Sequence, residues 1–101
     1  MRYKKVLLVD SQLRDMAKLM AEYVVPLTER GLQTAIITNE YSITIELSLF
    51  EEKMVTLSMT INRLEVGKMI YVSKLFEELC SNNVHDTLIK AKKFYKKKYK
   101  Y

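Results

Sequence analysis

The chain has 101 residues and is 49% hydrophobic, with two glycines and one proline. This length accommodates one domain with its own core, and the composition predicts that most of the chain is ordered. No apolar run approaches the ~20 residues that a helix needs to cross a membrane, and the apolar run near the N-terminus is too short for a signal peptide. Cys80 is the single cysteine, so an internal disulfide is excluded and a reducing, cytoplasmic location is expected.

The net charge of +5 is concentrated at the C-terminal end of the chain. Residues 84–101 include seven lysines and one aspartate, whereas residues 1–83 carry ten basic and eleven acidic side chains. We therefore divide the chain into a nearly neutral α+β core, residues 1–83, and a basic C-terminal helix or tail, residues 84–101.

The N-terminal segment allows two interpretations. Val6–Val9 are four consecutive apolar residues that end at Asp10, which suits a short buried strand followed by a helix that Ser11 caps and that runs to Val25. Alternatively, one long helix begins near Tyr3, because apolar residues recur at alternating spacings of three and four. This stripe consists of Val6, Val9, Leu13, Met16, Met20, Tyr23 and Leu27. We favour the strand, because a run that includes two valines suits burial on both sides.

Residues 4–12, KKVLLVDSQ, resemble the first strand of response-regulator receiver domains. Those domains have parallel strands, with acidic residues beside the end of the first one. Here Ser11 and Gln12 follow Asp10, and the segments downstream predict antiparallel strands. The resemblance therefore covers only this short segment and assigns no phosphate-accepting role to Asp10.

Pro26 interrupts the helical pattern in both interpretations of the N-terminal segment. Proline lacks the N–H that would bond the Glu22 carbonyl, so the helix is predicted to end or kink there, with Gly31 closing it. A strand is then expected over Gln33–Thr38. If Val6–Val9 is a parallel neighbour of that strand, the connection between them is a right-handed crossover.

The segment Ser42–Asn62 predicts an antiparallel hairpin. Apolar and polar residues alternate along two neighbouring runs, and a charged turn that includes Glu51 and Glu52 separates them. The apolar residues of the two runs are Ile43, Ile45, Leu47, Leu49, Val55, Leu57, Met59 and Ile61. One face of the hairpin is therefore expected to be buried, and the other, rich in serine and threonine, to be solvated or to contact a partner.

Two helices are predicted after the hairpin. Asn62 and Glu65 have the spacing of a capping box, although Gly67 favours a helix that starts at Lys68. The last segment can be capped by Asn83 or Asp86, and its final turns, KKFYKKKYKY, are expected to fray. The overall expectation is a small α+β domain, in which a three- or four-stranded sheet packs on two helices and a basic C-terminal helix follows.

The C-terminal segment mixes lysines with aromatic residues, which makes it the candidate binding site. The residues are Lys90, Lys92, Lys93, Phe94, Tyr95, Lys96, Lys97, Lys98, Tyr99, Lys100 and Tyr101. Lysines neutralise phosphates and aromatic rings stack on exposed bases, so this mixture suits single-stranded nucleic acid. Without arginine, such binding would tolerate any sequence. The competing interpretation is that lysines near a helix C-terminus only favour the macrodipole and solubility.

Residues suited to catalysis are sparse. A Cys80–His85 pair could act as nucleophile and base, but the sequence contains no second histidine, and a buried, inert cysteine is the preferred interpretation. One histidine and one cysteine cannot by themselves complete a zinc site, and the two isolated glycines form no phosphate-binding loop. We therefore expect no cofactor, no metal and no enzymatic activity.

Two functions remain. The preferred hypothesis is a non-catalytic protein-binding or regulatory module, acting by occupying a partner surface or by forming a homodimer, with a hairpin edge available for strand addition. A virus- or mobile-element-encoded inhibitor would belong to this class. The alternative is a sequence-tolerant nucleic-acid-binding protein that uses the basic C-terminal segment.

Overall fold

The computed structural model describes residues 2–51 and 53–99, with side chains from Leu13 onward. Three helices and a three-stranded sheet follow one another in the order α1, β1, β2, β3, α2, α3. Their bounds are α1 Arg2–Glu29, β1 Leu32–Thr38, β2 Ser42–Leu49, β3 Val55–Asn62, α2 Val66–Ser81 and α3 Val84–Tyr99. The predicted small α+β domain with a C-terminal helix is confirmed, and the sheet has the smaller of the two strand numbers that we considered.

The sheet is antiparallel, with β2 between β1 and β3. The predicted hairpin is confirmed at Ser42–Asn62, where Ser42 lies opposite Asn62 and Leu49 lies opposite Val55. The side chains alternate as expected, because successive residues of a strand point to opposite faces. The fully or nearly fully buried members of the pattern are Ile43, Ile45, Leu47, Leu49, Leu57, Met59 and Ile61.

The predicted strand at Val6–Val9 is wrong, because this segment belongs to α1, which begins at Arg2. The alternating spacing of three and four described above continues without a break into the well-packed part of the helix, where Leu13, Met16 and Met20 are buried. No glycine or proline separates the two parts, so the helix extends towards the N-terminus from its packed portion. With no first strand, the right-handed crossover is also absent from residues 2–51 and 53–99.

Pro26 lies inside α1, which continues to Glu29, so of the two predicted outcomes the end of the helix is wrong and the kink stays a prediction. Two residues later the Thr28 hydroxyl donates a hydrogen bond of 2.6 Å to the Val24 carbonyl. The helix then closes at Gly31 as predicted, with φ of 87°, a left-handed conformation that glycine adopts without steric cost. The Gly31 N–H donates to the Thr28 carbonyl at 3.0 Å.

The two later helices begin near the predicted capping residues. The Asn62 N–H donates to Glu65 Oε1 at 2.9 Å, and α2 starts directly after Glu65. Asn83 caps α3, because its Oδ1 accepts a hydrogen bond of 2.9 Å from the Asp86 N–H. The expectation that the last turns fray is wrong for the described residues, since α3 continues to Tyr99.

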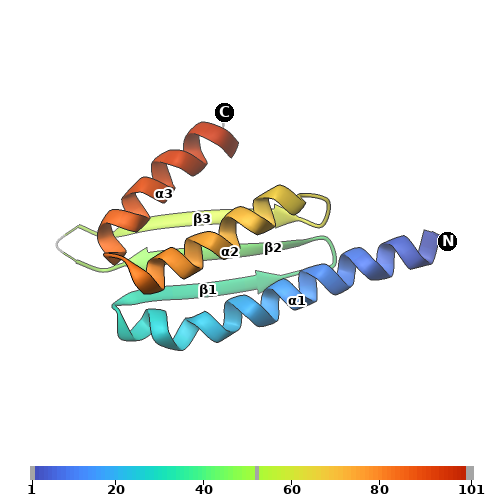
Figure 1. The fold of residues 1–101 in the computed structure, drawn as a ribbon, viewed down its shortest axis with the longest axis horizontal. Coiled ribbons are helices and arrows are strands. Elements are labelled where there is room, and N and C mark those ends of the chain that lie inside the picture. The colour runs from blue at the N-terminus through green and yellow to red at the C-terminus, as the bar shows by residue number, and fades with distance from the viewer. Residues whose placement is uncertain (1, 52, 100–101) are drawn as a thin grey trace.

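The helices cover one face of the sheet, with α1 along β1, α2 in the middle, and α3 packed on β3 and crossing it obliquely (Figure 1). Their apolar stripes meet the buried face of the sheet in one core, which includes Met20, Phe76 and Leu88. The other face of the sheet is polar and largely exposed, as at Glu46 and Ser58. The N-terminal turns of α1 extend past the end of the sheet (Figure 1).

Candidate functional site

The C-terminal helix α3 belongs to the packed core. Its buried residues are Val84, Thr87, Leu88, Ala91 and Tyr95. Spacings of three and four place them on one side of the helix, so the lysines between them are directed outwards. The basic segment is thus a docked helix with one apolar and one cationic face.

Tyr95 and Lys68 bind the same residue of β3. The Tyr95 hydroxyl accepts a hydrogen bond of 3.3 Å from the Thr60 N–H, and Lys68 Nζ donates one of 2.7 Å to the Thr60 carbonyl. In an antiparallel edge strand, the N–H and C=O of one residue point in the same direction, here away from β2. The outer edge of β3 is therefore occupied at Thr60, and the expected strand addition to the hairpin edge is blocked at this residue.

Lys68 is a structural cation. It is 9% exposed, and its Nζ lies 3.3 Å from Glu65 Oε2, 5.2 Å from the ring centre of Tyr95 and 4.9 Å from that of Tyr99. Burial lowers the pKa of Lys68, but the hydrogen bonds and charges of Tyr95 and Glu65 outweigh this effect and raise its pKa overall. The Lys68 ammonium group therefore links α2 to β3 and to α3, and it is not available to bind a ligand.

An aromatic cluster joins α2 to α3. The ring centres of Tyr71 and Phe94 are 4.7 Å apart, and those of Tyr95 and Tyr99 are 5.2 Å apart. Burial, with the charge of Glu78 as a smaller cause, raises the pKa of Tyr71 to about 12. Of the predicted stacking residues, Tyr95 is 4% exposed and Tyr99 is partly buried, while Phe94 remains 43% exposed. The two tyrosines thus serve helix packing, and among the described aromatic residues of α3 only Phe94 offers substantial area for a base.

Five of the six exposed lysines of α3 form its cationic face, whereas Lys98 follows the buried Ala91 by two turns and lies on the same side of the helix. The six exposed lysines are Lys90, Lys92, Lys93, Lys96, Lys97 and Lys98. Asp86 is the single acidic residue of the helix and lies in its first turn, where it suits the macrodipole, as Lys96–Lys98 do in the last turn. Lys100 and Tyr101 lie outside the described residues.

The Cys80–His85 pair is not assembled. Cys80 is partly buried on α2, where its backbone carbonyl accepts a hydrogen bond from Arg30, whose guanidinium also binds the Asn82 carbonyl. His85 is exposed, and its Nδ1 lies 3.5 Å from Asp86 Oδ1. Among the described residues, no group of histidine, cysteine and carboxylate side chains is arranged to hold a metal ion.

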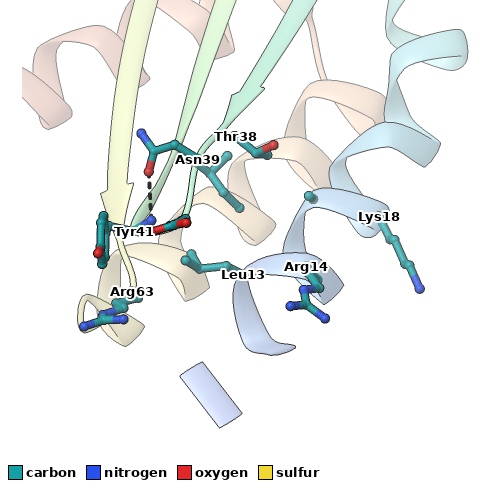
Figure 2. A pocket seen from close by; sticks show the side chains of 10 residues that line it. Leu13, Arg14, Lys18, Thr38, Asn39, Tyr41 and Arg63 are labelled. Atoms are coloured by element: carbon teal, nitrogen blue, oxygen red, sulfur yellow. Dashed lines mark hydrogen bonds between the residues drawn. The ribbon is translucent and has the colours of Figure 1, made fainter. Parts of the chain in front are cut away.

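A second basic surface lies where α1 leaves the end of the sheet (Figure 2). Arg14 and Lys18 of α1 form one wall of an open cleft, and Tyr41 and Arg63 form the other. Sequence reasoning missed this cleft, because its residues come from three distant segments. The spacing of Arg14 and Lys18, four residues apart on one helix, was the single local signal.

Comparisons with known protein families, with curated proteins and with solved structures found no match for this chain. Within residues 2–51 and 53–99, no helix combines the length and the apolar character that a membrane crossing requires. Functional inference therefore depends on the two basic surfaces and on the chemistry of their side chains.

Proposed function

We propose that this protein is a non-catalytic binding module that acts by occupying an acidic surface of a partner protein through the cationic face of α3. The observation that carries the proposal is the combination of five exposed lysines with a buried opposite face on one helix. Because Ala91 and Tyr95 are packed in the core, the lysines are held on a rigid support. Less conformational entropy is then lost when the helix docks.

The side chains of this face favour an acidic protein over single-stranded nucleic acid. Lysine is a flexible point charge, which complements carboxylates at varied positions and gives specificity mainly through charge. Binding of single strands usually combines such charges with several stacking rings. Here Tyr95 is engaged with Thr60 and Lys68, so Phe94 is the one well-exposed ring among the described residues of α3.

Nucleic acid is the second candidate, and the exposed part of Phe94 favours it. Lys98 Nζ lies 5.6 Å from the centre of this ring, so one base could stack beside a cation. Binding of this kind would rest mainly on phosphate contacts and would be sequence-tolerant.

Fluorescence anisotropy with two labelled probes, polyglutamate and a single-stranded oligonucleotide, separates the candidates. The variant is Lys92→Gln with Lys96→Gln, and the matched control is Lys53→Gln with Lys74→Gln, which removes the same charge from exposed sites elsewhere. We expect polyglutamate to bind at low salt, and the α3 variant to weaken this binding while the control does not.

The salt dependence of oligonucleotide binding is the second criterion that separates the two candidate functions. If the oligonucleotide binds more tightly than polyglutamate, and loss of the two α3 lysines reduces the slope of log K against log salt by about 1.4, the nucleic-acid candidate is correct. Failure of both probes to bind at low salt would refute both functions for α3. Equal weakening by the variant and the control would mean that only net charge matters.

A further inference from the structure

The cleft beside α1 has a different chemistry from α3. Arg14 and Lys18 lie on successive turns of α1, and Arg63 follows β3 on the opposite wall (Figure 2). Among the described residues that line the cleft, Glu40 is the only acidic one. Three cationic residues therefore lie around one opening, with the Lys18 side chain extending outwards from it (Figure 2).

Arginine is concentrated at this cleft. The sequence contains four arginines, of which Arg14 and Arg63 line the cleft, while Arg30 binds the carbonyls of Cys80 and Asn82. The helix α3 contains lysine and no arginine. Because a guanidinium can donate two parallel hydrogen bonds to a phosphate, arginine suits recognition of a defined anion, whereas the lysines of α3 act as point charges.

The cleft also offers apolar and aromatic surface. Leu13 and Ile43 lie among its lining residues and are buried, so they form an apolar floor. The Tyr41 ring is 58% exposed, and the guanidinium carbon of Arg63 lies 5.0 Å from its centre. A ligand that carries both an anion and a flat ring could therefore use both kinds of surface.

The turn that carries Tyr41 is held in place before any ligand binds. Asn39 Oδ1 accepts hydrogen bonds of 2.8 Å from the Tyr41 N–H and 2.9 Å from the Ser42 N–H. The Arg63 N–H donates to the Tyr41 carbonyl at 3.0 Å. The ring and the second wall of the cleft are thus positioned together, which reduces the entropy cost of binding.

We propose that this cleft binds a nucleotide. Arg14 and Lys18 hold its phosphates, and its base lies against Tyr41 and the apolar floor. The cleft has a volume of about 910 Å³, which is large enough for such a ligand. A free nucleotide and the phosphorylated end of a nucleic-acid strand share this chemistry. The inference uses no residue of α3 and is independent of the function proposed for that helix.

Isothermal titration calorimetry of the full chain with ATP, adenosine and tripolyphosphate tests the site. The variants are Arg14→Gln with Lys18→Gln, the charge-matched control Lys53→Gln with Lys74→Gln, and Tyr41→Ala. We expect the Arg14–Lys18 variant to weaken ATP binding by about tenfold or more, because it removes charge-assisted hydrogen bonds, and the control to leave it unchanged. Tyr41→Ala should weaken ATP but not tripolyphosphate.

Binding of a short oligonucleotide with and without a 5′-phosphate distinguishes a strand end from a free nucleotide. This binding is measured with the Lys92→Gln, Lys96→Gln protein, in which binding to α3 is reduced. Preference for the phosphorylated oligonucleotide over ATP would assign the site to a strand end, and preference for ATP to a free nucleotide. The proposal is overturned if ATP does not bind, if polyglutamate competes with ATP as well as tripolyphosphate does, or if the control weakens binding as much as the Arg14–Lys18 variant.

Discussion

Replacement of Tyr95 tests whether α3 is part of the folded core. The side chain is 4% exposed, packs against Tyr99 with ring centres 5.2 Å apart, and accepts the hydrogen bond from the Thr60 N–H. Truncation of a buried aromatic residue to alanine typically costs about 3–5 kcal/mol of unfolding free energy, through lost contacts and the cavity left behind. We therefore expect Tyr95→Ala to destabilise the whole domain by an amount in this range.

Tyr95→Phe separates packing from hydrogen bonding. This change keeps the ring but removes the hydroxyl that binds Thr60 and lies near Lys68, so we expect a cost of about 1 kcal/mol. The control is Lys96→Ala, the exposed neighbouring residue, which should change the unfolding free energy by less than about 0.5 kcal/mol.

Urea unfolding followed by far-UV circular dichroism measures all three variants. The expected order of destabilisation is Tyr95→Ala, then Tyr95→Phe, then Lys96→Ala, with one cooperative transition for each protein. If Tyr95→Ala unfolds at the same urea concentration as Lys96→Ala, the docked arrangement of α3 is refuted, and the lysines belong to a loosely attached tail.

Three further predictions concern the rest of the fold. Pro26→Ala should raise the unfolding free energy in urea by about 2 kcal/mol, because it restores a donor for the Glu22 carbonyl in α1, and a lower midpoint would contradict this. Gly31→Ala should lower it by about 1 kcal/mol, because φ there is 87°, and an unchanged midpoint would show that the turn relaxes without cost. The pKa of Tyr71 is raised to about 12 in the folded protein, so its contribution to stability is complete below pH ~10 and is lost as the pH rises towards 12. Unfolding measured in that interval should show a smaller loss of stability with pH for Tyr71→Phe than for the unchanged protein, and parallel pH profiles would refute the assignment.

The hairpin could be predicted from the sequence because its signal is local. Alternation over Ile43–Leu49 and Val55–Ile61 identifies the buried face without knowledge of any other element. The N-terminal run was harder, because four apolar residues at Val6–Val9 fit both a strand and a helical stripe. The helix is the correct interpretation, because that stripe continues into Leu13–Leu27, which packs on the sheet. The preference of valine for strands did not decide the structure of this segment.

The two candidate sites also differed in how much of each could be predicted from local sequence. The exposed lysines of α3 were predictable from composition, but the burial of Tyr95 depends on Thr60 and Lys68, which lie far away in the sequence. The spacing of Leu88, Ala91 and Tyr95 predicts a helix with an apolar face, but it does not identify the surface on which that face packs. The cleft could not be predicted, since the positions of its walls depend on how α1 packs on the sheet and where β3 ends.

The central claim is that the cationic face of α3 binds an acidic partner surface. Its most direct test is the ratio of the dissociation constants for labelled polyglutamate between the Lys92→Gln, Lys96→Gln protein and the Lys53→Gln, Lys74→Gln control, at equal net charge and low salt. We predict clearly weaker binding for the first protein than for the control. Equal dissociation constants would contradict the claim, because the positions of the lysines would then have no influence on binding.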